Sequence, residues 1–132
     1  MDLWECYKHS VFLCHQELGD DINFAIISAQ NPHGHIHLQP HNLRLDCQFE
    51  HDLARHGFPY RRVIGASPDL AFRESSWAVL CDKRRALEMA RQYQQNAIYW
   101  VEQGQLYLVA ALYGEHEEHL GAYRPRQIRL DD

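Results

Sequence analysis

The clearest element in the sequence is an apolar run of four residues, Phe24-Ala25-Ile26-Ile27. A continuous run of this length, rather than an alternating one, is typical of a strand that is buried on both faces in the middle of a sheet. We therefore predict a strand over residues 23–29. Pro32 ends it, because proline has no N–H for the sheet ladder and is expected to hold Asn31 in an extended conformation.

Two helices are predicted after this strand. The first covers residues 41–56, with Asn42 as its N-cap and Gly57 just past its end. Its apolar positions repeat at helical spacing, at Leu45, Phe49 and Leu53. The second helix begins after Asp82, a good N-cap residue, and runs to about Gln94.

Four further strands complete the pattern, over residues 60–65, 76–81, 97–102 and 105–112. The last two are joined by Gln103-Gly104, a pair that favours a tight hairpin turn. The order from Phe24 onward is therefore β-α-β-β-α-β plus a C-terminal hairpin strand. This order predicts an α+β fold, a ferredoxin-like split βαβ sandwich with two helices packed on one sheet.

The two ends of the chain have weaker patterns. Apolar residues near the N-terminus fit either one helix over residues 2–18, or a short helix to about Lys8 followed by a strand over residues 10–15. Residues 114–132 show no periodicity and are expected to form a surface tail. We expect a single domain over residues 1–132, with its core at about residues 10–113.

Composition narrows the class of protein. The chain has 132 residues, of which 45% are hydrophobic, and this is enough for one core. No apolar run approaches the roughly 20 residues that span a bilayer, and the N-terminus lacks a signal-peptide pattern, so we expect a cytoplasmic protein without membrane contact. A net charge of −5 with neutral histidines argues against nucleic-acid binding. Four scattered cysteines, Cys6, Cys14, Cys47 and Cys81, form no C-x-x-C pair and are expected to be reduced and mostly buried.

Five stretches carry a family resemblance. They are Leu3-Trp4-Glu5-Cys6-Tyr7, Phe24 to Pro32 with its terminal Asn-Pro, Asn42, Phe72 to Val79 with Glu74 and Ser76, and Gln94-Gln95-Asn96-Ala97-Ile98. Together they are similar to an uncharacterised bacterial family catalogued as domain of unknown function three-two-nine-three, up to about residue 109. Gln30 is a departure, since the family usually has Trp there. The resemblance favours the short helix followed by a strand at the N-terminus, and it implies no activity.

Polar residues at the ends of predicted elements form the main candidate site. They are Asn31, Asn42, Glu74, Gln95 and Asn96. Amides donate and accept hydrogen bonds, and a carboxylate can act as a base or bind a cationic or hydroxyl group, so the set suits a polar small molecule. The alternative is a set of local roles, because Asn-Pro makes a turn and Asn42 can cap a helix. Arg84 and Arg85, in the first turn of the second helix, would add a phosphate contact.

His33, His35 and His37 are weak candidates for a metal site. In an extended segment, their spacing of two residues would place three rings on one side, an arrangement that suits zinc. The spacing matches no defined metal motif. The sequence therefore predicts neither a bound metal nor another cofactor.

Three functional hypotheses remain open at this point. The first is binding of a polar or anionic, nucleotide-like small ligand at the Asn-Pro corner. The second is a hydrolase or transferase with Glu74 as general base, which would show as a raised pKa and a concave pocket around that residue. The third is an interaction module that forms a homodimer through a strand edge or through the hairpin from Tyr107 to Tyr113.

Overall fold

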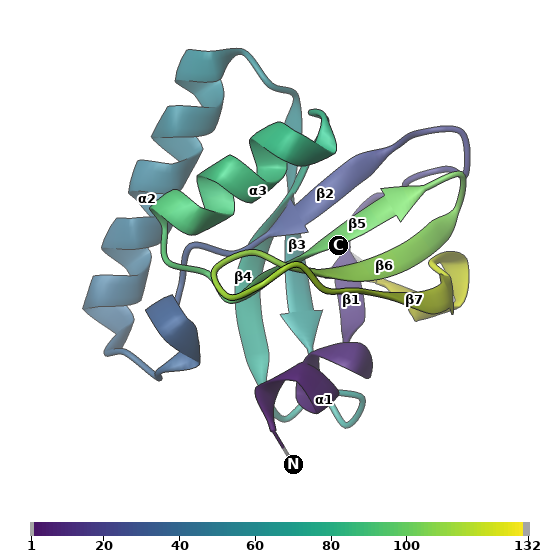
Figure 1. Ribbon diagram of the computed structural model, residues 1–132, viewed down its shortest axis with the longest axis horizontal. Helices are drawn as coiled ribbons and strands as arrows, with labels where there is room; N and C mark the ends of the chain where they lie inside the picture. Colours follow the sequence, from purple (N-terminus) through teal and green to yellow (C-terminus); the bar gives the residue numbers. More distant parts are fainter. Residues whose placement is uncertain (1, 131–132) are drawn as a thin grey trace.

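The computed structural model describes residues 2–130, which form a curled eight-stranded sheet with three α-helices (Figure 1). The strands are β1 (Val11–Cys14), β2 (Phe24–Ile27), β3 (Tyr60–Ala66), β4 (Arg73–Val79), β5 (Ala97–Glu102), β6 (Gln105–Ala110), β7 (Glu117–Ala122) and β8 (Gln127–Arg129). The helices are α1 (Leu3–Lys8), α2 (Gln39–His56) and α3 (Lys83–Gln92), with short 3₁₀ turns η1 (Pro32–Gly34) and η2 (Arg124–Arg126). The strand order is β7-β6-β5-β2-β4-β3-β1-β8. Every pairing is antiparallel except that of β1 with β8.

Strand β2 lies in the middle of this sheet, as its continuous apolar run predicts. All four of its residues are buried. Ala25 and Ile27 face the helices, whereas Phe24 and Ile26 face the opposite side. The sheet therefore carries a hydrophobic core on each face, and both cores need a cover.

Helices α2 and α3 cover one face, side by side against the sheet (Figure 1). Asp82 is the N-cap of α3, as predicted, and its carboxylate accepts a hydrogen bond from the N–H of Arg85 at 2.7 Å. Helix α2 begins at Gln39, two residues earlier than predicted, because Pro40 presets the backbone of the first turn. The N-cap position is Leu38, so the prediction that Asn42 caps this helix is wrong.

The second core fills the concave face with aromatic rings. The ring of Phe12 lies 5.5 Å from that of Tyr123 and 4.9 Å from that of Tyr99, between centroids. The ring of Phe24 meets Tyr123 edge to face at 5.4 Å. Since Phe12 is on β1 and Tyr99 is on β5, the curl of the sheet brings two strands that are far apart in the strand order into contact across the concave side.

The N-terminus forms a short helix and then a strand, which decides between the two interpretations of residues 2–18. The predicted surface tail is wrong for residues 117–129. Strand β7 pairs with β6, β8 pairs with β1, and Tyr123 is only 3% exposed. Strand β7 is polar because it lies at the edge of the sheet, so it lacks the apolar pattern of an inner strand. Its pairing also means that β6 is not a free edge for dimerisation.

Two further predictions, the start of strand β4 and the burial of the cysteines, are wrong. Strand β4 begins at Arg73 instead of residue 76, so Glu74 lies within a strand and its side chain has a defined direction. Cys14 is buried and Cys81 is half-buried, but Cys6 and Cys47 are exposed, so the cysteines are not mostly buried.

The two tyrosines of the concave core allow a test of its polar contacts. The hydroxyl of Tyr99 donates to the carbonyl oxygen of Tyr7 at 2.7 Å and lies 2.8 Å from Ser10 Oγ. The buried hydroxyl of Tyr123 has no hydrogen-bond partner within residues 2–130. We expect Tyr99→Phe to lower the free energy of unfolding by about 1–3 kcal/mol, because it leaves a carbonyl oxygen without its donor.

Tyr123→Phe is the matched control. It should leave the free energy of unfolding unchanged or raise it by up to about 1 kcal/mol, since it removes an unpaired polar atom. Urea denaturation of both variants measures the difference. Equal destabilisation by the two substitutions would contradict the assignment of these hydroxyl contacts.

Candidate functional site

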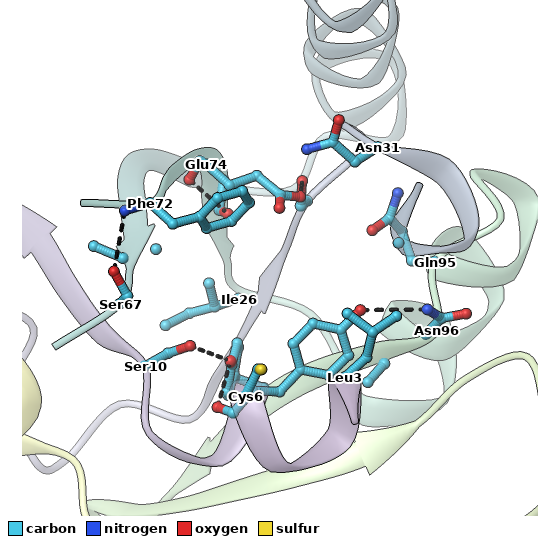
Figure 2. A pocket seen from close by; sticks show the side chains of 18 of the residues that line it. Leu3, Cys6, Ser10, Ile26, Asn31, Ser67, Phe72, Glu74, Gln95 and Asn96 are labelled. Carbon is cyan, nitrogen blue, oxygen red and sulfur yellow. Dashed lines mark hydrogen bonds between the residues drawn. The ribbon is translucent and has the colours of Figure 1, made fainter. Parts of the chain in front are cut away.

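The end of the concave face away from Tyr123 is hollow. A pocket of about 400 Å³ lies there, between the sheet, helix α1, the loop after β2 and the β3–β4 hairpin (Figure 2). This volume lies in the lower part of the range for small-molecule sites, roughly 300–1,000 Å³. Along β2 and its extension, the side chains that face this side change from Phe24 through Ile26 to Ser28. Polarity therefore increases from the filled core toward the pocket.

Two glycines shape this space. Gly65 on β3 is paired with Glu74 on β4, so no side chain from β3 stands beside the carboxylate. Gly34, at a φ of +76°, lets α1 approach the loop, because a Cβ there would lie 2.6 Å from Leu3 Cδ1. The first glycine leaves the pocket open, and the second lets α1 form its wall.

Asn31 and Asn42 join the end of β2 to helix α2 through a reciprocal set of hydrogen bonds. The N–H of Asn31 donates to Asn42 Oδ1, and Asn42 Nδ2 donates to Asn31 Oδ1, both at 2.9 Å. The N–H of His37 donates to the same Asn31 oxygen, also at 2.9 Å. Because this oxygen already has two donors, the NH₂ group of Asn31 is the part that faces Glu74 (Figure 2).

The prediction that Pro32 holds Asn31 in an extended conformation is wrong. The backbone of Asn31 is left-handed, with φ 49° and ψ 60°. Asparagine tolerates this region better than most residues, and its contacts to Asn42 and His37 offset the preference that Pro32 would impose.

Glu74 is the charged group of the pocket. Ser28 Oγ donates to its Oε1 at 2.5 Å. Burial raises the pKa of Glu74 above its usual value, and the hydrogen bonds from Ser28 and Asn31 lower it in part. Among the described residues that line the pocket, Glu74 is the only Asp, Glu, Lys, Arg or His. Its carboxylate therefore has hydrogen-bond donors but no cationic partner among these lining residues.

Gln95 and Asn96 enter the pocket from the junction between α3 and β5. Gln95 Nε2 donates to the carbonyl oxygens of Gln30 at 3.0 Å and Tyr93 at 3.3 Å. These bonds fix the amide so that its own carbonyl oxygen turns toward the cavity (Figure 2). Asn96 Nδ2 donates to the hydroxyl of Tyr7 at 3.3 Å, which links this junction to helix α1.

Four of the five predicted polar residues thus line one pocket: Asn31, Glu74, Gln95 and Asn96. Asn42 stands behind Asn31 and holds it in place. Arg84 and Arg85 are not part of this site, because α3 packs on the opposite face of the sheet. Arg84 is 80% exposed, with its Nε 4.0 Å from Glu88, and Arg85 lies over the ring of Phe58.

The histidines do not form the expected row. Residues 32–34 make a 3₁₀ turn with His33 at φ 60°, so the segment is not extended. Nδ1 of His37 lies 3.0 Å from Nδ1 of His41, while the rings of His33 and His35 are 6.3 Å apart. Residues 2–130 contain no group of three or more His, Cys, Asp or Glu side chains placed to hold a metal.

Several residues that line the pocket were not predicted from the sequence as site residues. Ser28 and Ser76 could have been found by continuing the alternation of β2 and β4 past their apolar residues, because each lies two positions from a residue of the concave core. Leu3, Tyr7 and Phe72 could not, since their place depends on how α1 and the β3–β4 hairpin fold over the sheet.

A family model described as "Protein of unknown function (DUF3293)" matches residues 27–98, more than half of the chain. The chain belongs to this family. The matched stretch contains Ser28, Asn31, Glu74, Gln95 and Asn96, whereas α1 lies outside it. No curated protein and no solved structure matched the chain. Within residues 2–130, no helix is both long and apolar enough to cross a membrane.

The raised pKa of Glu74 predicts how stability depends on pH. The Glu74 carboxyl group holds its proton more tightly in the folded protein than in the unfolded chain. Its ionisation therefore lowers the free energy of unfolding as the pH rises above about 4.3 and through the pKa of the folded state. We therefore expect Glu74→Gln to be more stable than the wild type at pH 7, and we expect the difference to disappear near pH 4.

Denaturant unfolding at several pH values measures this difference. Glu88→Gln on α3 is the control, because it makes the same substitution at a largely exposed position. A gain in Glu74→Gln that is the same at pH 4 and pH 7 would show that burial of the charge is not its cause.

Proposed function

We propose that this protein binds a small molecule with a polar head and an apolar body in the pocket between α1 and the sheet. The observation that carries the proposal is the composition of the pocket wall. Glu74, Asn31 and Gln95 present polar groups to a space whose walls also include Leu3, Ile26 and Phe72 (Figure 2). Mostly apolar walls with a few convergent polar groups are typical of small-molecule sites.

The polar groups are also held in place before any ligand arrives. Asn31 is fixed by Asn42 and His37, and Gln95 is fixed by two backbone carbonyls. Side chains that are already ordered lose little entropy on binding, which favours affinity and specificity. This supports a role in recognition beyond the local role of the Asn-Pro turn.

The proposed ligand is polar, as one of the hypotheses from the sequence states, but it is not anionic. A phosphate or carboxylate needs a cation or several free N–H donors. The described lining residues include no Lys, Arg or His, and Glu74 would repel an anion. A nucleotide phosphate therefore has no partner in this pocket.

A graded series at Gly65 tests whether the pocket binds ligands. A Cβ at this position would meet Ser76 Oγ at 3.8 Å and the carbonyl oxygen of Glu74 at 3.9 Å, which are ordinary contacts. Gly65→Ala, Gly65→Val and Gly65→Leu should fold and progressively fill the space. For fragments found by ligand-observed NMR, we expect affinity to fall along the series, by about tenfold or more at Leu, which is about 1.4 kcal/mol.

Thermal unfolding of each variant without ligand shows whether the fold is retained. Fragments that bind Gly65→Leu as well as they bind the wild type would place their site elsewhere. A screen without any hit would remove the support for the proposal.

A second candidate is a hydrolase or transferase in which Glu74 is the general base. It is favoured by the raised pKa of Glu74 and by its 2.5 Å hydrogen bond from Ser28 in a concave pocket. A base with a pKa nearer to neutral is better matched to proton transfer. The Glu74 carboxylate would take the proton from a water molecule or a substrate hydroxyl as that oxygen attacks the carbonyl carbon of an ester. The carbonyl π electrons move to the carbonyl oxygen, and their return breaks the bond to the leaving alkoxide, which takes up the proton from Glu74.

Turnover distinguishes the two candidates. If Glu74 is a general base, a panel of chromogenic esters should include substrates whose kcat falls by a factor of about 100 or more in Glu74→Gln, with KM nearly unchanged. Glu88→Gln is again the control. A panel that the wild type does not turn over would leave binding as the better supported function.

We also propose that the elements from β2 to β5 form a ferredoxin-like split βαβ unit. Two features support this: the order β5-β2-β4-β3 in the middle of the sheet, and the position of α2 and α3 on one face. Strands β6 and β7 then extend one edge, while β1 and β8 extend the other. An experimental structure with another order of the four central strands would contradict the assignment.

A further inference from the structure

We infer that the polar head of the ligand is an organic cation, an ammonium group on an apolar body, and that it pairs with Glu74. The inference rests on the proposed binding function and names the ligand class for the same pocket. Three observations carry it: the unpaired acidic group, the direction of the neighbouring acceptor, and the apolar surroundings of the opening.

The first observation is a carboxylate with no counter-ion among the described residues that line the pocket. Acidic side chains that are shielded from water are normally paired with a cation or a metal, and Glu74 is half-buried. Glu74 receives hydrogen bonds from Ser28 and Asn31, and the other titratable groups that act on it are the hydroxyls of Tyr7 and Tyr99. None of these groups carries a positive charge. A cation in the cavity would complete the pairing.

The second observation is a further acceptor that faces the same space. The carbonyl oxygen of Gln95 turns into the pocket, because its NH₂ group is held by two backbone carbonyls (Figure 2). An ammonium group has three N–H donors and no acceptor. Glu74 and Gln95 together offer more acceptors than a hydroxyl head could use, whereas an ammonium can donate to both.

The third observation concerns the body of the ligand. Three of the lining residues are large apolar side chains that remain exposed: Leu3 at 45%, Ile36 at 73% and Phe72 at 48%. They would contact the apolar part of a molecule whose head has entered the pocket. A bare metal ion fits less well, because residues 2–130 contain no cluster of three ligating side chains. The chemistry therefore points to an alkyl or aryl ammonium.

Such a group can come from a free amine or from a lysine side chain of another protein. Both carry an apolar stem and a terminal ammonium. The decisive experiment uses probes with one body and different heads: 2-phenylethylamine, 2-phenylethanol and 3-phenylpropionate. Nα-acetyl-lysine methylamide is added to represent a lysine side chain. Affinities are measured by calorimetry or by protein-observed NMR with the wild type, Glu74→Gln and Glu88→Gln.

We expect the amine to bind more tightly than the alcohol, and the carboxylate to bind most weakly. Glu74→Gln should weaken the amine by about 25-fold or more, as for a buried charge pair that loses one partner. It should change the affinity of the alcohol by less than about threefold, and Glu88→Gln should change neither. The isosteric Gln can still accept the hydrogen bond from Ser28, so the fold is expected to remain intact.

The pH dependence is an independent measurement. Tyr7 and Tyr99 have pKa values raised by burial above their usual value of about 10, so neither changes its charge near neutral pH. The thiol of Cys6 also lines the pocket, and Glu74 is the one carboxylate among the described lining residues. Amine affinity should increase as the pH rises from about 4.5 to about 7.5, because the carboxylate becomes ionised while the amine stays protonated. The alcohol should not gain affinity over this range.

The possible outcomes separate the inference from the binding function. Tighter binding of the alcohol or the carboxylate, or an amine affinity that Glu74→Gln leaves unchanged, would overturn the cationic head and keep the pocket as a binding site. Failure of all four probes to bind would overturn the inference, while the fragment screen and the Gly65 series decide the binding function separately. Tighter binding of the lysine mimic than of 2-phenylethylamine would identify a lysine side chain as the source of the ammonium.

Discussion

The double burial of β2 is the constraint on which the rest of the structure depends. Its residues are apolar toward both faces, so the sheet cannot leave either side open to water. Helices α2 and α3 cover one side. The other side is covered by the curl of the sheet itself, through Phe12 and Tyr123, and this cover extends over only part of the face. The pocket occupies the remaining part, beneath α1, so the site is a consequence of how the second core is closed.

A second constraint fixes the polar side of that pocket. The chain must turn sharply from the end of β2 into α2, and the turn at Asn31 uses a left-handed residue that is bonded to Asn42 and His37. The same bonds that stabilise the turn also orient the NH₂ group of Asn31 toward Glu74. A structural role in the turn and the proposed role in ligand binding are therefore compatible for this residue. The local hydrogen bonds of an Asn-Pro corner are the means by which one donor is aimed into the cavity.

Elements with strong local signals could be predicted from the sequence, and contacts between distant elements could not. The apolar run of β2, the cap at Asp82 and the strand over residues 97–102 all have local causes, and the structure contains each of them. The edge strands β7 and β8 carry no apolar pattern, and Asn42 acts on a residue 11 positions away instead of on its own helix end. Four polar residues converge as expected, but the wall formed by Leu3 and Tyr7 depends on the packing of α1.

The partial burial of Glu74 unites these features. Gly65, opposite it on β3, leaves the carboxylate beside a cavity, where a larger residue would fill the space with hydrocarbon. Ser28 and Asn31 solvate the charge only in part, so burial still raises its pKa. An arrangement selected for stability alone would place a neutral or apolar side chain at this position, because an unpaired buried charge weakens the fold. This loss of stability is consistent with the proposed binding function. Sites that bind charged groups commonly retain such local destabilisation until the ligand supplies the missing partner.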